Sequence, residues 1–181
     1  MKHVLFRADD AGSSHSANRA IKECVRAGVV RNVSFMVPGP AFEAAVELIA
    51  PVKGIDRGLH VTLNSEWDRV KWGPVTDPRL VPSLVAEQGA FTASPAELRE
   101  RGFCPDEAMR EVASQLEYAR QCGLEPDYLD EHMGVAWIGL ADRLRDFARR
   151  EGLRYRPELP GIAFTHRECV ADELAAAPSP A

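Results

Sequence analysis

Two hydrophobic periods alternate along the chain, and this alternation predicts an α/β fold. Apolar runs of strand length lie at 4–6, 29–37, 58–63, 128–133 and 153–156. Between these runs, apolar residues recur every three or four positions, which indicates amphipathic helices. Strands that alternate with helices favour a parallel sheet with helices packed on it.

The predicted helices begin near capping residues and end at glycine or proline. Either Ser14 or Ser16 could cap the first helix, which runs to about Arg26. The other helices are predicted at 41–49, 106–122 and 140–151, with a short helical turn at 95–102 and a segment at 168–176 that could be helical.

The long connection over residues 64–95 is rich in proline and glycine. Connections of this length are usually lids or binding loops. Trp67 and Trp72 could stack on a sugar ring, or they could pack the loop onto the body of the protein. The sequence favours neither alternative.

The composition is that of a globular protein and argues against several partners. The chain has 181 residues, of which 45% are hydrophobic and 27% charged, and a net charge of −5. We assign a single domain to residues 1–176 and a disordered tail to 177–181. We expect no nucleic-acid partner, because there is no basic cluster, and no membrane partner, because no apolar run is long enough to span a bilayer. Because the first strand begins without a signal-peptide pattern, we expect a cytoplasmic protein with reduced cysteines.

Side chains with metal-binding chemistry lie at the ends of the predicted strands. Asp9 and Asp10 end the first strand, and His60 and His132 lie in later ones. The C-terminal ends of parallel strands share one edge of the sheet, where catalytic groups gather. One carboxylate and two imidazoles suit a divalent metal that keeps positions open for water and substrate. The second carboxylate could then accept a proton.

Each of these residues also has an ordinary structural explanation. One aspartate of the Asp9-Asp10 pair could cap the next helix while the other is solvated. His60 could be a hydrogen-bonded interior residue, and His132 a rim residue beside Asp130. The joint pattern favours a metal site, because all of these residues lie at the ends of successive predicted strands.

The same residues resemble the motifs of the YdjC-like carbohydrate deacetylases, and the similarity covers about residues 2–156. The matching stretches are Arg7-Ala8-Asp9-Asp10-Ala11-Gly12 for N-A-D-D-F-G, Asn18-Arg19-Ala20-Ile21 for N-x-A-I, Ser34-Phe35-Met36 for S-L-M, Gly58-Leu59-His60 for G-L-H, 80–91 for L-x-x-x-x-G-x-F, Glu111 to Gln115 for E-x-x-x-Q and 123–132 for G-x-x-P-x-x-x-D-x-H. Several motifs in the family's order make the resemblance specific.

The resemblance implies a distorted TIM-like (β/α) barrel with parallel strands. It also implies hydrolysis of the N-acetyl group of an N-acetylated, chitin-derived oligosaccharide by a metal-activated water. The residues it implies are Asp9 as catalytic base, Asp10, His60 and His132 as ligands of Mg²⁺ or Zn²⁺, and Arg156 near the sugar. We expect Asn64 to bind the substrate as well.

The chain also departs from the family pattern. Arg7 replaces the usual asparagine, Ala11 the usual phenylalanine, and Gly134 stands where many members have a second histidine. A complete barrel needs about 250 residues, and the family's H-P-G motif, with its general-acid histidine, is absent. We therefore expect a barrel truncated at its C-terminus, in which His15 or His166 could replace the general acid.

Two other functions remain open at this point. The chain could be a truncated, catalytically inactive relative that binds a sugar or a metal, or it could be a metal phosphoesterase. An incomplete barrel leaves strand edges exposed, so a homodimer is a further expectation.

Overall fold

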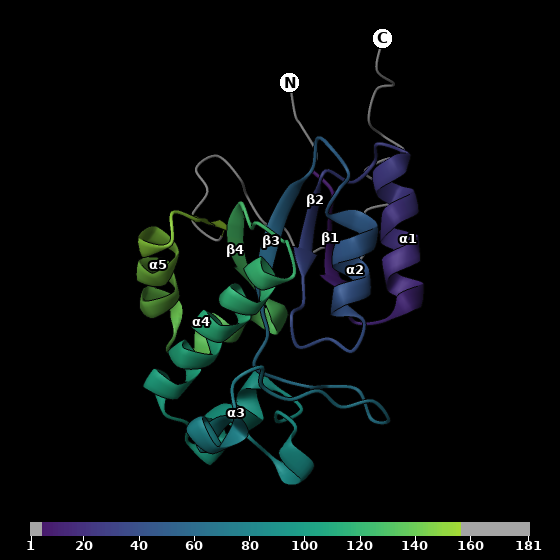
Figure 1. Ribbon diagram of the computed structural model, residues 1–181. Helices are drawn as coiled ribbons and strands as arrows, with labels where there is room; N and C mark the ends of the chain where they lie inside the picture. Colours follow the sequence, from purple (N-terminus) through teal and green to yellow (C-terminus); the bar gives the residue numbers. More distant parts are fainter. Residues whose placement is uncertain (1–4, 157–181) are drawn as a thin grey trace, which may run out of the picture.

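The protein has an α/β fold built on one parallel sheet (Figure 1). The computed structural model describes residues 5–156. In this part of the chain the sheet has five strands in the order β1-β2-β3-β4-β5, and each strand pairs with the next in parallel. The predicted fold class is thereby confirmed. The strand order, in which sequence neighbours are spatial neighbours, is that of a (β/α) barrel.

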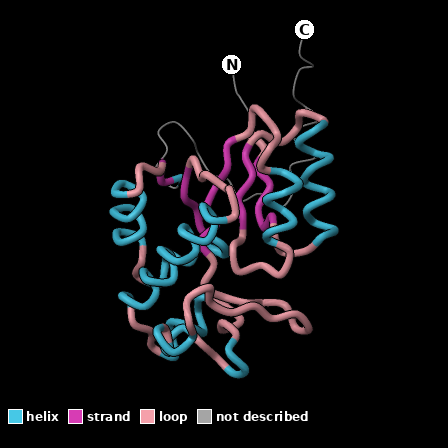
Figure 2. The backbone as a smooth tube through the Cα atoms, viewed as in Figure 1, coloured by secondary structure: helices cyan, strands magenta, loops and turns pink. Residues whose placement is uncertain are grey.

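The strands are short, and helices connect them (Figure 2). The strands are β1 (Arg7–Ala11), β2 (Asn32–Phe35), β3 (Asp56–Val61), β4 (Tyr128–Glu131) and β5 (Arg154–Tyr155). The α-helices are α1 (His15–Arg26), α2 (Phe42–Ile49), α3 (Pro95–Arg101), α4 (Pro105–Gln121) and α5 (Ala141–Arg150). The 3₁₀ segments are η1 (Pro78–Leu80), η2 (Pro82–Leu84), η3 (Glu87–Gly89) and η4 (His132–Ile138).

The helices pack on the sheet through aliphatic side chains. α1 packs against α2, α4 against β3 and α5 against β5. The long connection after β3, which includes α3, lies below the sheet in Figure 1, at the end where β3 stops. Leu59 and Val61 of β3 are fully buried in the core, as the alternation predicts.

The polar face of the sheet is also buried. Ser34 and Asp130 are fully buried there, and the cross-strand register places His60 beside Asp130. The Tyr128 ring lies over Gly58, so that a Cβ at residue 58 would lie 2.3 Å from Tyr128 Cε2. Gly58, which has no side chain, therefore leaves room for the Tyr128 ring on the polar face of the sheet.

The first strand differs from the prediction. We expected an apolar strand at 4–6 that stops at the aspartates, whereas β1 begins at Arg7 and contains both of them. Leu5 and Phe6 precede the strand and are exposed. Pairing with β2 starts at Arg7, so backbone pairing and not side-chain hydrophobicity sets the strand's limits. The other strands lie within about two residues of their predicted C-terminal ends.

Several predictions fall outside the described residues. These are the helix at 168–176, the tail at 177–181 and a role for His166. None of the helices in residues 5–156 combines the length and the apolar character needed to span a bilayer.

Ser14 and not Ser16 caps α1, which decides between the two predicted caps. The Ser14 Oγ accepts a hydrogen bond from the Ala17 N–H at 3.1 Å. We expect Ser14→Ala to lower the free energy of unfolding by about 1 kcal/mol, because an N–H of the first turn loses its acceptor. Ser16→Ala, the matched control, removes only the exposed 3.1 Å contact between the two hydroxyls and leaves the cap to Ala17 in place, so it should change the free energy of unfolding by less than about 0.5 kcal/mol. Urea denaturation of both variants measures the difference, and equal effects would contradict the assignment.

Candidate metal centre

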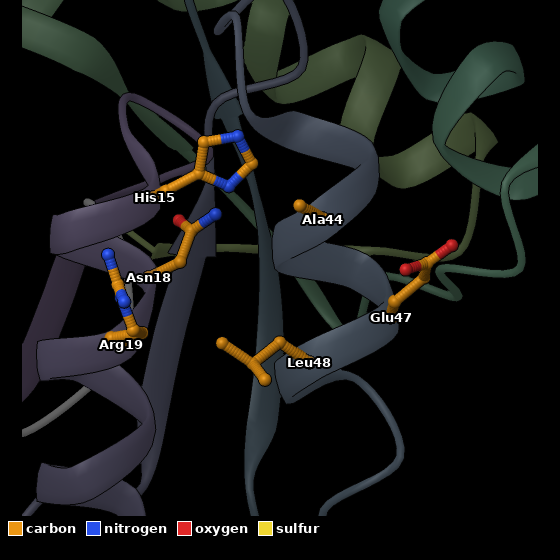
Figure 3. Close-up of a pocket in the computed structure, with 6 residues that line it drawn as sticks. All are labelled: His15, Asn18, Arg19, Ala44, Glu47 and Leu48. Atoms are coloured by element: carbon orange, nitrogen blue, oxygen red, sulfur yellow. The ribbon is translucent and has the colours of Figure 1, made fainter.

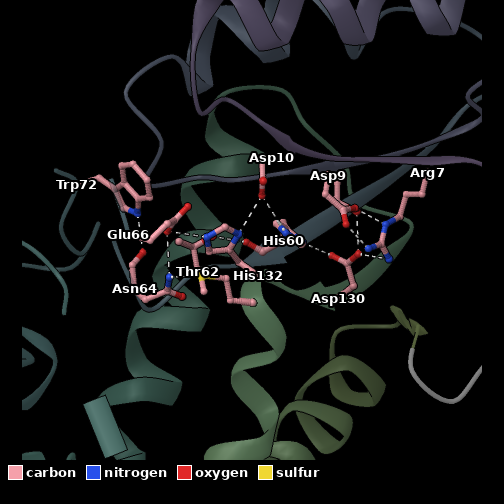
Figure 4. Close-up of polar contacts among 12 residues, drawn as sticks. Arg7, Asp9, Asp10, His60, Thr62, Asn64, Glu66, Trp72, Asp130 and His132 are labelled. Atoms are coloured by element: carbon pink, nitrogen blue, oxygen red, sulfur yellow. Dashed lines mark hydrogen bonds and ion pairs between the residues drawn. The ribbon is translucent and has the colours of Figure 1, made fainter. Parts of the chain in front are cut away.

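Asp10, His60 and His132 converge at the C-terminal edge of the sheet (Figure 4). Asp10 Oδ1 lies 3.2 Å from His60 Nε2 and 2.9 Å from His132 Nδ1. The two imidazoles meet edge to face, with ring centroids 5.3 Å apart. One ligand atom from each of these side chains lies within 4.8 Å of the others, a spacing that suits a single divalent ion. The structure thus brings together the residues that the sequence predicted as metal ligands.

A bulge in β1 turns Asp10 towards the histidines. The register with β2 shifts between Ala8 and Ala11, and Asp10 has a φ of 61°. Positive φ is uncommon for residues other than glycine, although aspartate tolerates it better than most. Bulges commonly re-aim a side chain next to a functional site. In a regular strand, Asp9 and Asp10 would point to opposite faces of the sheet.

The turn after β1 is fixed by Asn18, which is buried on α1. Asn18 Oδ1 accepts a hydrogen bond from Gly12 N at 2.8 Å, and Asn18 Nδ2 donates to Ala41 O at 2.9 Å. Asn18 belongs to the N-x-A-I motif, and its contacts explain why that motif accompanies the aspartate pair.

Asp130 is a buried partner of His60; the sequence placed it beside His132 at a strand end but gave it no role. Its side chain is fully buried, and its Oδ1 lies 2.7 Å from His60 Nδ1. Its Oδ2 accepts a hydrogen bond from Ser34 Oγ at 2.8 Å and pairs with Arg7 Nη1 at 2.7 Å. A carboxylate that binds the outer nitrogen of a ligand histidine fixes the orientation of the ring.

The charges of this cluster shift the pKa values of its members strongly. Burial alone would lower the pKa of His60, but the Asp130 and Asp10 carboxylates outweigh it and raise this pKa to about 9. Burial opposes ionisation of Asp10, yet hydrogen bonds from His132 and His60 hold its pKa well below the usual range. The pKa of Asp130 is also lowered, because His60 and Arg7 outweigh its burial. The site therefore favours ionised carboxylates around a positive centre.

A second group of possible ligands is formed by Asp9, His60 and Asp130, and a positively charged side chain already lies beside it. The Arg7 guanidinium hydrogen-bonds to Asp9 and pairs with Asp130. Figure 4 shows this guanidinium next to both carboxylates. Arg7 thus supplies the positive charge here, and the metal-binding geometry belongs to the group around Asp10.

Glu111 and Gln115 of α4 anchor the chain beside the site. The Gln115 side chain bonds to both the N–H and the C=O of Thr62, at 3.2 and 2.7 Å. The Glu111 carboxylate accepts hydrogen bonds from the backbone N–H groups of Val75 and Thr76. Burial raises the pKa of Glu111 even though these donors oppose the shift. The E-x-x-x-Q motif thus ties α4 to Thr62, the residue directly after β3, and to the long loop.

Glu66 reaches the site from the long loop, and sequence reasoning missed it. Its Oε2 lies 3.1 Å from His132 Nε2 and accepts a hydrogen bond from Asn64 Nδ2 at 3.0 Å. The Asn64 side chain is buried and also contacts Met133 Sδ at 3.0 Å. Glu66 lies outside the strands and outside every motif, so the hydrophobic pattern carried no signal for it.

Arg156 follows β5 and lies within electrostatic range of the site. Burial lowers the pKa of its guanidinium, and so does the nearby charge of Arg7, while Asp130 and Asp9 oppose the shift. The structure therefore places this predicted substrate-binding residue on the Arg7 side of the cluster.

The two tryptophans of the long loop have different environments. Trp72 is 5% exposed, and its Nε1 donates to Asn64 O at 2.7 Å, so it packs the loop onto the body. Trp67 lies edge-on against Trp72, with centroids 5.4 Å apart, and is 37% exposed. Trp67 alone retains an accessible ring for stacking.

A separate groove lies between α1 and α2 (Figure 3). It has a volume of about 680 Å³ and is lined by His15, Asn18, Arg19, Ala44, Glu47 and Leu48. His15 is exposed and faces this groove. His15 is the first residue of α1, and its role as a substitute general acid stays a prediction.

Comparison with known proteins places the chain in a family. A family model described as YdjC-like protein matches residues 3–179. The chain therefore belongs to the YdjC-like family, as its motifs predicted.

The curated relatives are named carbohydrate deacetylases. One from Vibrio cholerae serotype O1 (strain M66-2) is 31% identical over 129 residues, which cover 71% of this chain and 48% of the relative. One from Thermoanaerobacter pseudethanolicus (strain ATCC 33223 / 39E) is 27% identical over 133 residues, which cover 73% of this chain and 50% of the relative. The chain spans about half the length of the curated relatives it matches.

A solved structure shares the fold. It is a protein of Enterococcus faecalis V583, described provisionally as a cellobiose-phosphate cleavage protein. The TM-score is 0.68 at 25% identity, and the match covers 83% of this chain and 57% of the other. This likeness is consistent with a distorted barrel.

Proposed function

We propose that the protein is a metal-dependent carbohydrate deacetylase that hydrolyses the N-acetyl group of an N-acetylated, chitin-derived oligosaccharide. The observation that carries the proposal is the convergence of Asp10, His60 and His132 on one point at the edge of the sheet. The names of the family relatives support the reaction class. The cytoplasmic location and the homodimer remain predictions from the sequence.

The donor set fits a hard or borderline divalent cation such as Mg²⁺ or Zn²⁺. Asp10, His60 and His132 would hold it through one oxygen and two nitrogens, which leaves positions open for substrate. When bound, such an ion polarises a carbonyl and lowers the pKa of a water molecule.

In the proposed reaction Asp9 is the general base. Its side chain is 40% exposed, and Arg7 holds it beside the buried cluster. Asp9 accepts a proton from the water that attacks the acetyl carbonyl. The carbonyl carbon gains the water oxygen, and the bond between carbon and nitrogen breaks as the nitrogen takes up the proton that Asp9 removed from the water. The products are acetic acid, which ionises to acetate, and a sugar amine. Arg156 is the proposed contact to the sugar. Asn64 was predicted as a second contact, but its side chain is fully buried and bonds to Glu66.

Asp9→Asn should reduce acetate release from N-acetylated chitooligosaccharides by about 10²- to 10⁴-fold, because the amide cannot accept the proton. Metal binding should persist, since Asp9 is not one of the proposed ligands. The measurement is acetate release with added Mg²⁺ or Zn²⁺, alongside a metal titration of the same variant. Asp142→Asn, an exposed carboxylate on α5, is the control and should match the wild type.

The proposal fails if the wild-type chain binds metal but releases no acetate from a broad panel of acetylated sugars. Phosphate release from sugar phosphates, lost in Asp10→Ala, would favour a phosphoesterase instead.

A further inference from the structure

We propose that Glu66 sets the tautomer and the orientation of His132, so that the Nδ1 atom of this ring faces the metal. The inference rests on the metal site of the proposed function and concerns a residue that the motifs do not include. The Glu66 Oε2 atom lies 3.1 Å from His132 Nε2, while His132 Nδ1 lies 2.9 Å from Asp10 Oδ1. The two nitrogens of the ring thus face two different carboxylates.

The chemistry of the imidazole makes this arrangement directional. A neutral imidazole carries one proton, and the other nitrogen presents a lone pair. An ionised carboxylate only accepts hydrogen bonds, so Glu66 favours the proton on Nε2 of His132. When the metal is bound, the lone pair then lies on Nδ1 and faces the proposed metal position, in place of the hydrogen bond that Nδ1 makes to Asp10 in this structure.

The other ligand histidine has the same design. Asp130 Oδ1 lies 2.7 Å from His60 Nδ1 and leaves His60 Nε2 facing Asp10 at 3.2 Å. Each imidazole is therefore placed between Asp10 and an outer carboxylate, although opposite nitrogens face the metal position. Carboxylates of this kind fix the tautomer of a ligand histidine and raise its basicity. Glu66 does for His132 what Asp130 does for His60.

Glu66 lies in a loop, but its position is fixed by buried neighbours. Asn64 Nδ2 donates to the same Glu66 Oε2 at 3.0 Å. The backbone carbonyl of Asn64 accepts a hydrogen bond from Trp72 Nε1 at 2.7 Å, and Ser65 Oγ accepts one from the backbone N–H of Trp72 at 3.0 Å. The buried Trp72 thus anchors residues 64–66, and Asn64 holds the carboxylate against His132.

Removal of the carboxylate should weaken metal binding. Glu66→Ala is expected to lower the affinity for Zn²⁺ by about 10- to 100-fold, the range typical of outer partners of a ligand histidine. Glu66→Gln should lose less, because its carbonyl oxygen can still accept the Nε2 proton. Asn64→Ala should shift the affinity in the same direction, since Glu66 then loses its donor.

The experiment is a competition titration of the whole chain with Zn²⁺ and a chromophoric chelator. Asp68→Asn, an exposed carboxylate in the same loop, is the matched control and should bind Zn²⁺ as the wild type does. Asp10→Ala gives the baseline for Zn²⁺ held by cysteine thiols. A thermal melt without metal checks that each variant is folded.

Nitrogen-15 spectra of the Zn²⁺-loaded protein supply a readout that a purely structural role would not move. In the wild type we expect His132 to carry a slowly exchanging proton on Nε2, and in Glu66→Ala that proton should exchange rapidly. Equal Zn²⁺ affinity in the wild type and Glu66→Ala, or a His132 proton on Nδ1, would overturn the inference and leave the proposed function intact. A wild type that binds no more Zn²⁺ than Asp10→Ala would overturn both.

Discussion

Asp10→Ala should abolish specific binding of a divalent metal and reduce acetate release by at least about 10³-fold. Metal catalysis supplies several kcal/mol of transition-state stabilisation, and about 1.4 kcal/mol corresponds to a factor of ten. Asp10 is the only carboxylate that contacts both ligand histidines within residues 5–156, at 3.2 and 2.9 Å. Its loss leaves two imidazoles, and the neighbouring Asp9 is engaged with Arg7.

Metal-dependent stabilisation measures this effect without an activity assay. A ligand that binds only the native state at 100 times its dissociation constant adds about 2.7 kcal/mol to the free energy of unfolding. The melting temperature of the wild type should therefore rise with added metal, whereas that of Asp10→Ala should stay constant. Asp77→Ala removes a carboxylate that pairs with Arg79 in the long loop, and it should respond to metal as the wild type does. A metal-induced shift of equal size in Asp10→Ala would contradict the assignment of this site.

The strand pattern predicted which residues meet at the candidate site, whereas only the family resemblance assigned different roles to Asp9 and Asp10. His60 and His132 were recognisable because parallel strands bring their C-terminal ends together. The separation of Asp9 from Asp10 depends on the bulge in β1 and the positive φ of Asp10, which local sequence patterns do not encode. Arg7, noted only as a departure from the family motif, turns out to bind both Asp9 and Asp130.

The parts that sequence reasoning missed are contacts between distant segments. Asp130 is separated by 70 residues from His60 and by 96 from Ser34. Glu66 meets His132 across 66 residues from a loop without regular periodicity. Hydrophobic patterns report which face of an element is buried, but they do not report which polar groups meet on the buried face.

Asp130→Ala should cause a large loss of stability that is independent of metal. Asp130 is fully buried and joins the charged groups of Arg7 and His60 with the hydroxyl of Ser34. Removal of one partner from a buried ion pair leaves an uncompensated charge and typically costs about 3–5 kcal/mol. We expect a decrease of this size in the free energy of unfolding, measured by urea denaturation in the presence of a chelator. Asp106→Ala breaks an exposed pair with Arg143 and should cost less than about 1 kcal/mol.

The pH dependence of this loss tests its cause. The pKa of His60 is raised from its ordinary value of 6.5 to about 9 in the folded protein. Its pairing with Asp130 therefore stabilises the folded state fully below pH 6.5, and this stabilisation is lost as the pH rises through about 9. The stability difference between the wild type and Asp130→Ala should therefore narrow as the pH rises from about 6.5 to about 9 and stay level above that. It should not vanish there, because Arg7 remains charged and stays paired with Asp130. At acidic pH the lowered pKa of Asp130 keeps the pair intact until the pH falls below the ordinary carboxyl range. A difference that stays constant through pH 9 would show that packing, and not the charge on His60, makes Asp130 necessary.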